Sequence, residues 1–576
     1  MRRLVVRHET TNCRASQQCL RWLGVQLQDK EGSKNLRILS PQSFETPHII
    51  PIKPVPLPCS IHAIMPSATT NQATTNVGPT NGKVVQLFYL CSLFAAVNES
   101  CKDMNNITYS SANSDNDRAP TPFQVFLCKL AQICDTEKGG DTITALVALR
   151  GANGPAYRFA SNNRKKTELD DTKKFLSDLL DFVGKNPDGL AEKPLKKQVL
   201  WRILEFNFPR VDWYLKRVVI SIGECIEKSL SAETQDGSDI VLQLRQIEAK
   251  ASFPRDMSSG YNARPKFLSD CETLMKAIHY AKETGFNKAM NERASVGDSE
   301  AVHSWCELRH YLGRLLSYRQ AADSIVGAYK KWPELFTDFT VEHIPSSRLV
   351  RLSLPKPTLS PMEVIPAAFP DMNVDEYASH IEQLRDYNLD GHIQDKLRQK
   401  PMRQLVHCEV HLQNFLVRTK MAEPDDYWNK SMFIATSKPP CRLCRYYFND
   451  PENDFLVQSS HMNVYSKWRL PDIYEGQDEN TLTRQEELLD DIIEQMQQDT
   501  LHIVREQLPQ WKRNDSRTDS WTGQSAMLGN GQKERSDTRN SGRVSTMSGA
   551  SGWGMRTERH HFESPSSDDD SDYDNL

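Results

Sequence analysis

The chain has 576 residues, of which 38% are hydrophobic, and a formal net charge of −4 at pH 7. This length is enough for two or three domains, and the low apolar content indicates that long stretches are not packed. A chain so close to neutral is not a strongly basic nucleic-acid-binding protein, although it leaves room for local basic patches. The 13 cysteines show no dense framework of paired spacings, which is typical of a reducing compartment. We therefore expect an intracellular protein, cytoplasmic or nuclear.

The first 80 residues differ in composition from the rest of the chain. Residues 1–80 are rich in Pro, Thr and Asn, which predicts a disordered leader and linker. The beginning, MRRLVVRHETTNCRASQQCLRWL, is rich in Arg and nearly free of acid, a weak form of the mitochondrial presequence pattern. The apolar stretch at 84–97 is too short to span a bilayer. We predict a buried helix there and no membrane partner.

Helical periodicity dominates residues 81–334. The segments 123–133, 212–230 and 301–332 each place apolar residues three and four positions apart, so each helix has one buried face. The short run DTITALVAL at 141–149 is ambiguous between a strand and a helix. We therefore predict a mainly helical region, whose surface is available to protein partners.

Between residues 335 and 475 the pattern changes. Short segments with β-branched residues alternate with helical patterns there, which predicts the α/β class. The best hairpin candidate is 339–353, a helix is expected near 374–387, and 455–471 has the pattern of a strand followed by its exit.

A long amphipathic helix is predicted at 483–508. Thr483 and Glu486 form a capping-box pattern at its start, and Pro509 ends it. Its apolar stripe consists of Leu488, Leu489, Ile492, Ile493 and Met496. Residues 513–576 are rich in Ser, Arg, Gly and Asp and bury too little apolar surface to offset their ordering entropy, so we predict a disordered tail.

The CxxC of this chain lies at Cys441 and Cys444, and the motif HCEVHL lies upstream. We predict a helix from residue 406 with His407 in its first turn, and a second helix that opens at Pro440 after an apolar strand. The positive end of a helix dipole favours thiolate over thiol, which is the form that a metal needs. A histidine and two cysteines suit Zn²⁺ and leave a fourth position open for water.

Glu409 follows His407 by two residues and can reach such a water without being a ligand. The order H-x-E followed by P-C-x-x-C is the pattern of the zinc deaminases, in which a glutamate acts as general acid and base. Zinc lowers the pKa of its bound water to about 7. The interval between His407 and Cys441 holds one helix, a loop and one strand, as that arrangement requires. A redox CxxC, the main alternative, leaves His407 and Glu409 without a role.

Three successive blocks, HCEVHLQNFL, IATSKPPCRLCRYYF and SSHMNVYSKWRLP, resemble the OTT-like deaminase family, which is abundant in fungi. The resemblance covers 403–471, and in it Ser437 and Lys438 match the SK dipeptide before the cysteines. The residues that match the closing block are His461, Tyr465, Trp468, Leu470 and Pro471. The resemblance implies a cytidine-deaminase-like three-layer sandwich at 335–475, with a central sheet between helices. That fold usually begins with a hairpin shortly before the H-x-E helix, whereas the hairpin candidate at 339–353 lies well upstream.

Three further residues are candidate substrate contacts. Ser437 offers its carbonyl or hydroxyl to an amine, or is simply a serine at the end of a strand. Arg442 offers a guanidinium fork to a phosphate, or belongs to a solvated helix surface. His461 stacks on or hydrogen-bonds a base, or packs near Trp468. The substrate stays open among a nucleobase, a nucleotide, a nucleic acid and a non-nucleobase amine.

Two other interpretations use the same residues. In the first, His411 joins His407, Cys441 and Cys444 in a closed Cys₂His₂ site, and the chain is a zinc-stabilised scaffold. In the second, a deaminase-like domain has lost its activity and serves as an interaction domain. An inactive relative has no chemical need for Glu409, which favours the enzyme.

Overall fold

The computed structural model describes most of the chain between residues 81 and 510. The described residues are 81–105, 120–231, 237–255, 257, 262–294, 299–354, 359–398, 403–473 and 479–510. They all fall within one compact unit, Ala73–Leu576. The predicted leader at 1–80 and the predicted tail at 513–576 lie outside the described residues.

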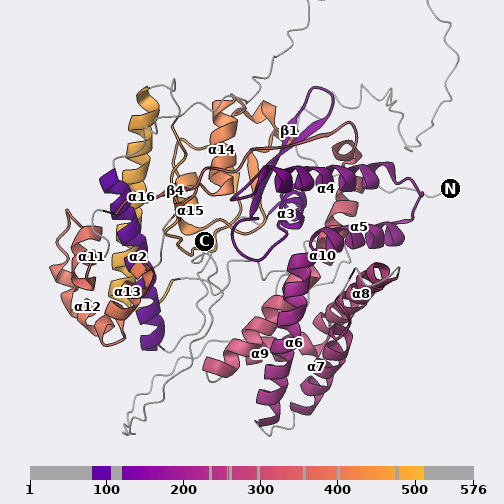
Figure 1. Cartoon of the computed structure of the whole chain (residues 1–576), viewed down its shortest axis with the longest axis horizontal. Coiled ribbons are helices and arrows are strands. Elements are labelled where there is room, and N and C mark those ends of the chain that lie inside the picture. Colours follow the sequence, from indigo (N-terminus) through magenta and orange to yellow (C-terminus); the bar gives the residue numbers. More distant parts are fainter. Residues whose placement is uncertain are drawn as a thin grey trace, which may run out of the picture. The chain divides into compact units, whose positions relative to one another are not determined.

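A mixed five-stranded sheet in the order β3-β2-β1-β6-β7 lies at the centre of the described residues. Its strands are β1 (Thr144–Arg150), β2 (Pro155–Ser161), β3 (Thr340–His343), β6 (Phe433–Thr436) and β7 (Leu456–Val457). β1 pairs antiparallel with both β2 and β6, whereas β3 is parallel to β2 and β7 is parallel to β6. A second, two-stranded sheet pairs β4 (Val350–Arg351) with β5 (Arg403–Gln404). Three distant parts of the chain therefore build one sheet (Figure 1).

The hairpin of this sheet lies in a different place from the one expected. It is formed by β1 and β2 at 144–161, whereas the candidate at 339–353 supplies β3 and β4, which do not pair with each other. The run at 141–149 is accordingly strand from Thr144 onward. The sandwich therefore extends beyond the expected bounds of 335–475, because strand pairing joins residues that are far apart in sequence and a local pattern does not specify the partner.

Burial on both faces explains why the run at 141–149 was ambiguous. Leu146 and Ala148 pack in the core cluster that contains α3 (Pro122–Cys134). Ala145, Val147 and Leu149 pack in the cluster that contains α14 (Cys408–Arg418). A strand that is covered on both faces has no alternation of polar and apolar residues, so its periodicity does not distinguish it from a buried helix.

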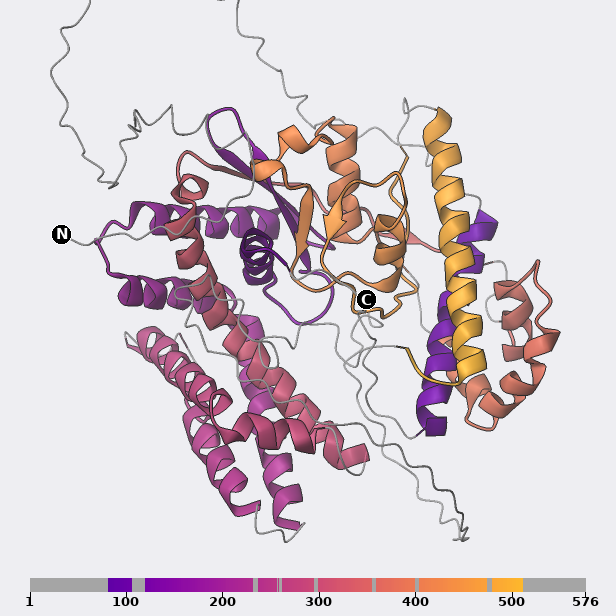
Figure 2. The same cartoon turned by 180° about the vertical axis from the view of Figure 1, so that it is seen from behind.

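Helices cover both faces of the sheet (Figure 2). α3 lies against β1 and β6 on one face, and α14 lies against β1, β2 and β6 on the other. α3 begins at a capping box in which Thr121 and Gln124 bond each other's backbone N–H, with Pro122 at the first helical position. The described residues therefore have the layers of an α/β sandwich.

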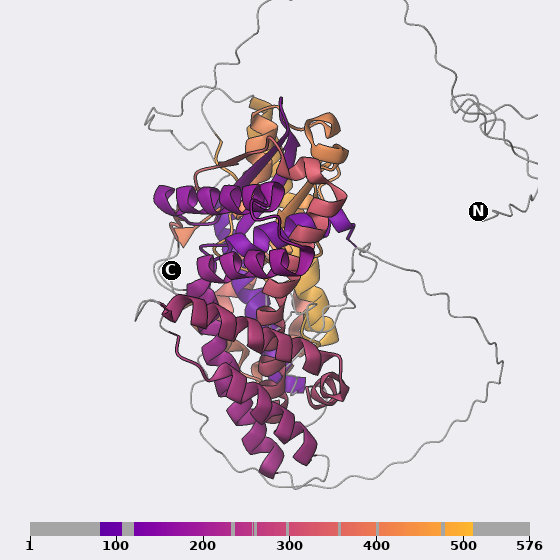
Figure 3. The same ribbon diagram turned by 90° about the vertical axis from the view of Figure 1, so that its right-hand side faces the viewer.

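Residues 81–334 are mainly helical, as predicted, apart from the β1–β2 hairpin. The helices after the hairpin extend to one side of the sheet (Figure 3). They are α4 (Lys166–Lys185), α5 (Glu192–Phe206), α6 (Phe208–Ser231), α7 (Gly237–Ala251), α8 (Ala263–Lys282), α9 (Gly285–Arg293) and α10 (Ser299–Lys331). The amphipathic α6 buries the apolar residues that recur at helical spacing, Val211, Leu215, Val218 and Ile222, and it packs against α10.

The helices α2 (Asn81–Asn105) and α16 (Glu479–Glu506) lie side by side (Figures 1 and 2). α2 is the buried helix that was predicted, but it is longer than its apolar stretch. Among the described helices it is the one long and apolar enough to cross a membrane, and 78% of its apolar window is buried inside the protein. Three short helices pack beside this pair: α11 (Pro361–Ala368), α12 (Ala378–Arg385) and α13 (Leu389–Arg398).

The helix α16 confirms the predicted apolar stripe and corrects its start. Leu489, Ile492, Ile493 and Met496 are buried. The helix begins at Glu479, before the capping-box pattern, which therefore lies inside the helix. Long amphipathic helices draw their stability from the packing of the apolar face, so contact with α2 extends the helix past a local start signal.

Candidate metal centre

Three side chains predicted as zinc ligands converge on one point. The Nδ1 atom of His407 lies 3.5 Å from Cys441 Sγ and 3.3 Å from Cys444 Sγ. The two sulfur atoms are 3.5 Å apart. All three residues are buried. The described residues contain no other group of three or more His, Cys, Asp or Glu side chains that is close enough to hold a metal.

Two helix starts place these ligands. His407 is the N-cap of α14, one residue before the first turn in which it was expected. Cys441 is the N-cap of α15 (Arg442–Phe448), and its sulfur accepts a bond from the backbone N–H of Cys444. α15 follows the buried strand β6, as predicted. The N-terminal dipole of each helix thus faces the ligand cluster, where it favours negative charge on sulfur.

The spacing of the three atoms fits zinc. Zn–S bonds of about 2.3 Å and Zn–N bonds of about 2.0 Å in tetrahedral geometry separate ligand atoms by roughly 3.5–3.8 Å, close to the observed distances. The second ring nitrogen of His407, Nε2, is buried and has no hydrogen-bond partner among the described residues. The polar contacts of the His407 ring are therefore made by its Nδ1 atom, with the sulfurs of Cys441 and Cys444.

The cluster also favours ionised sulfur. Burial raises the pKa of the Cys441 thiol, but the hydrogen bond from Cys444 and the charge of His407 outweigh burial and lower the pKa to about 6. Burial and the neighbouring Cys441 sulfur raise the pKa of Cys444 instead. Burial lowers the pKa of His407, but the Cys441 charge outweighs it, so the net shift is upward. One thiolate is thus available near neutral pH before any metal binds.

Glu409 lies in the first turn of α14 and is buried. Its carboxylate accepts a hydrogen bond from the Cys408 thiol at 3.3 Å, and its charge acts on the pKa of both metal-site cysteines. It lines a cavity of about 10 Å³ beside the ligand cluster, which is about the space that one water needs. The residues that line this cavity are Ile143, Asn162, His407, Glu409, Lys438, Pro439, Cys441, His461 and Tyr465.

Asn162 and Lys438 are two of the five cavity residues that were not predicted as site residues. Asn162 follows β2; its Oδ1 accepts from the Cys408 N–H at 2.8 Å, and its Nδ2 donates to the Gly140 carbonyl at 2.9 Å. No local signal marks Asn162, because it lies 246 positions before Cys408. Lys438 lies in a turn whose carbonyl accepts from the Gln458 side chain at 2.8 Å. The sequence marks Lys438 only as part of the SK dipeptide, and the structure places the residue in the wall of the cavity.

Ser437 extends the pairing of β1 with β6. Its backbone N–H donates to the Thr144 carbonyl at 2.9 Å, and its hydroxyl accepts from the Thr144 N–H at 3.1 Å. Ser437 is not among the residues that line the cavity. These contacts agree with the interpretation of Ser437 as a serine at the end of a strand.

Arg442 has neither of the two roles considered for it. Its side chain is buried rather than solvated, and its guanidinium contacts protein groups instead of the cavity. It forms an ion pair with Asp499 of α16 and donates to the carbonyls of Met462 and Gln510, both at 3.1 Å. The sequence prediction missed this because α16 approaches α15 only in the folded chain.

His461 does line the cavity, together with Tyr465. The backbone N–H of Asn463 donates to His461 Nδ1 at 3.0 Å, which assigns the proton of the neutral ring to Nε2. The Tyr465 ring packs edge-on against His461, with centroids 5.7 Å apart. Trp468 is buried core and pairs with Leu405 through an isolated bridge.

His411 is not a metal ligand. Its Nε2 lies 2.9 Å from the carbonyl oxygen of Pro345, and it is absent from the ligand cluster. Burial lowers its pKa, so the neutral ring donates this hydrogen bond. The structure therefore does not bring His411 to the other three side chains, as the closed Cys₂His₂ interpretation requires.

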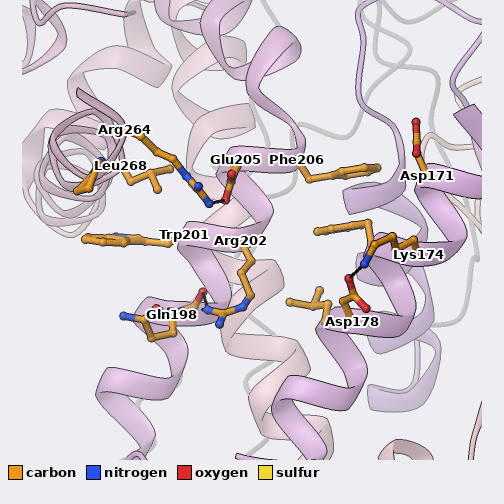
Figure 4. A pocket seen from close by; sticks show the side chains of 13 residues that line it. Asp171, Lys174, Asp178, Gln198, Trp201, Arg202, Glu205, Phe206, Arg264 and Leu268 are labelled. Atoms are coloured by element: carbon orange, nitrogen blue, oxygen red, sulfur yellow. Dashed lines mark hydrogen bonds and ion pairs between the residues drawn. The ribbon is translucent and has the colours of Figure 1, made fainter. Parts of the chain in front are cut away.

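A much larger groove lies between α4, α5 and α8 and has a volume of about 860 Å³ (Figure 4). Phe175 and Phe206 stack there with their centroids 3.8 Å apart. Its charged side chains form ion pairs within the groove, as in Lys174–Asp178 and Arg264–Glu205. None of the residues in the cavity beside the ligand cluster lines this groove.

Comparison with known proteins identifies a family from one segment of the chain. No curated protein and no solved structure matches this chain. One family model does match, that of the OTT_1508-like deaminases, over residues 406–472. The match begins one residue before His407 and ends just after Pro471, so it contains all three converging ligands and Glu409. This segment of the chain is therefore similar to the OTT-like deaminase family, as its motifs predicted.

Proposed function

We propose that this protein is a zinc-dependent hydrolytic deaminase that acts on an amine of the nucleobase type. The observation that carries the proposal is the joint placement of three ligand atoms and one carboxylate. His407 Nδ1, Cys441 Sγ and Cys444 Sγ would hold the ion, and Glu409 lies on the cavity beside them. Three protein ligands leave the fourth zinc position for water, which distinguishes a catalytic site from a structural one.

Glu409 would perform the proton transfers. Bound zinc supplies the Lewis acidity that makes a water reactive near neutral pH. The Glu409 carboxylate would accept a proton from the attacking water, donate a proton to the ring nitrogen beside the amine, and later pass a proton to the leaving ammonia. Its burial keeps bulk water from competing for these transfers. The Cys408 thiol donates a hydrogen bond to one oxygen of the Glu409 carboxylate and thereby orients this carboxylate.

The arrangement of the fold supports the same assignment. The hairpin β1–β2 precedes the H-x-E helix α14, which is followed by strand β6, the cysteine helix α15 and strand β7. This order is the one that the cytidine-deaminase-like sandwich implies, with a long helical insertion after the hairpin. We infer that the insertion, and not a missing hairpin, accounts for the distance between β2 and the H-x-E motif.

The other cavity residues indicate how a substrate ring would be held. The His461 ring lines the cavity, and an imidazole can exchange a hydrogen bond with a carbonyl oxygen or a ring nitrogen. Tyr465 presents an aromatic face beside it. We propose an aminated heterocycle as substrate, either free or within a nucleotide or nucleic acid. The ten cysteines in the described residues are all free thiols, which supports an intracellular location for the activity.

Ammonia release tests the proposal directly. The full chain would be assayed with cytosine, adenine and guanine as bases, nucleosides, nucleotides and single-stranded oligonucleotides, after its zinc content is measured. We expect about one zinc per chain and ammonia from at least one substrate class. Glu409→Gln should keep zinc and lose roughly 10²–10⁴-fold in rate, because an amide cannot carry the proton.

The controls separate the alternatives. Asp178→Asn, which changes a carboxylate in the groove, should leave both zinc and rate unchanged. A protein with zinc but no turnover on the whole panel would favour the inactive interaction domain. A wild-type rate in Glu409→Gln would remove Glu409 from the mechanism.

A further inference from the structure

The residue that follows the first metal-site cysteine makes an unusual set of contacts. Arg442 is 2% exposed, and its guanidinium forms an ion pair with Asp499 of α16. It also donates to the Gln510 carbonyl at 3.1 Å, just beyond the end of α16. Below it, the Phe94 ring of α2 lies 4.6 Å from the guanidinium carbon. Arg442 therefore joins the cysteine helix to both helices of the α2–α16 pair.

The same residue fixes one wall of the cavity. The backbone N–H of Arg442 donates to the Asn463 carbonyl at 2.9 Å, and its side-chain Nε donates to the Met462 carbonyl at 3.1 Å. These two carbonyls belong to the loop that carries His461 and Tyr465 into the cavity. Met462 has a φ of +64°, a left-handed backbone that an unbranched L residue adopts only when its surroundings hold it.

Burial makes these contacts depend on α16. A guanidinium removed from water is costly unless its charge is paired and its N–H groups are bonded. Asp499 supplies the opposite charge. The carbonyls of Met462 and Gln510 accept hydrogen bonds from the guanidinium group, and the Phe94 ring packs against it. A lysine at this position has one ammonium group and cannot reach carbonyls on both sides. The helix α16 thus completes the surroundings of Arg442, although it lies outside residues 406–472 that match the deaminase family.

We propose that Arg442 is a positioning residue for the metal centre, and that Asp499 makes the C-terminal helix α16 part of the catalytic unit. By holding the start of α15 and the loop at 460–465 together, Arg442 sets Cys441 against His461 and Tyr465. The proposal rests on the proposed function only in calling this centre catalytic. The positioning itself does not depend on the reaction.

Asp499→Asn in the full chain tests the proposal, with Asp490→Asn as the matched control. Both residues lie on α16 and both pair with a cation, but Asp490 pairs with Lys83 on the exposed side of the α2–α16 pair. Hydrogen exchange would be followed by mass spectrometry for 441–448 and 460–465. We expect Asp499→Asn to speed exchange in both segments by about 10- to 100-fold, as loss of a hydrogen-bonded charged partner predicts. Asp490→Asn should leave both unchanged.

Cobalt substitution provides a readout that a purely structural role would not move. In Asp499→Asn the visible spectrum of the Co²⁺ protein should shift and the metal should leave to a chelator at least tenfold faster, whereas Asp490→Asn should match wild type. If a substrate is known, kcat should fall more than KM rises. Asp499→Glu, which keeps the charge, should recover part of each effect and serves as the second variant if Asp499→Asn does not fold.

Two outcomes overturn the proposal. Exchange in both segments equal to that of Asp490→Asn would show that Arg442 does not depend on Asp499 for its position. Equal exchange combined with an altered Co²⁺ spectrum would show that the change at the metal does not come from a loosening of these two segments. A chain that binds no metal or releases no ammonia would contradict the proposed function, and the exchange measurement would still decide the role of Arg442.

Discussion

The small cavity beside the ligand cluster and the groove on α4, α5 and α8 differ in volume by nearly two orders of magnitude, about 10 Å³ against about 860 Å³. The groove has polar and aromatic walls (Figure 4), but four of its charged side chains form ion pairs with each other at the surface. Arg264 and Glu205, for example, are 58% and 36% exposed. In the cavity, His407, Glu409 and Cys441 are buried, and His407 and Cys441 converge with Cys444 on one point.

Volume is therefore a poor guide to chemistry in this chain. Removal from water strengthens electrostatic interactions and lets neighbours shift pKa values, which an exposed ion pair in high dielectric does not do. A deaminase also needs room for a water at the metal before it needs room for the substrate. The comparison predicts that changes at the cavity alter metal binding, and that changes at the groove do not.

The largest effect should follow from removing a ligand. Cys441→Ala should lower bound zinc from about one per chain to none, because two remaining protein ligands cannot retain the ion in competition with water. Metal analysis by atomic emission measures this. Cys225→Ala is the matched control, since Cys225 is an equally buried thiol outside the cluster. Zinc retained in Cys441→Ala would place the metal elsewhere.

The buried ion pair of Asp135 and Arg210 should contribute more to stability than any ion pair in the groove. The two lie 2.5 Å apart and are almost fully buried. Asp135→Asn should destabilise the protein by about 3–5 kcal/mol, because it leaves the Arg210 charge buried without a partner. Asp178→Asn, which breaks the exposed Lys174 pair, should cost about 0–1 kcal/mol. Urea unfolding of both variants measures the difference.

The pH dependence of the same pair gives a second measurement. Burial raises the pKa of Asp135, but the charges of Arg210 and Lys438 outweigh burial and hold it below its usual value. A depressed folded-state pKa stabilises the protein above the unfolded pKa of about 3.9, and the contribution is lost as pH falls through the folded value. Wild type and Asp135→Asn should therefore differ most near neutral pH and converge in acid. A constant difference would exclude Asp135 ionisation as the cause.

A smaller effect is expected at His411. His411→Ala should retain zinc with near-native affinity and cost about 1 kcal/mol for the lost bond to the Pro345 carbonyl. Zinc titration and thermal unfolding measure the two quantities, and His407→Ala, which should lose the metal, is the matched control. A large loss of affinity in His411→Ala would restore the closed site that the geometry contradicts.

The smallest effect should come from the groove. Arg264→Ala removes an exposed pair with Glu205 and should change stability by less than about 1 kcal/mol. Zinc content and ammonia release should stay at the wild-type level. Reduced turnover at unchanged zinc would show that the groove takes part in substrate binding, and the contrast between the two regions would then disappear.

Local sequence was enough to predict the ligand set and the carboxylate. His407, Cys441 and Cys444 converge as predicted, and Glu409 faces the same cavity. The starts of α14 and α15 place these residues, and where a helix starts depends on a few neighbouring residues. The apolar stripe of α16 was predictable for a similar reason, since a helical period is a local property.

The pairing of the strands and the burial of particular side chains could be seen only in the folded chain. The tertiary structure placed the hairpin at 144–161, brought Asn162 to the cavity, turned His411 away from the metal site and buried Arg442 against α16. In each case the deciding partner lies far away in sequence. Strand pairing and burial are set by packing between distant segments, and the free energy of that packing has no counterpart in the local order of residues.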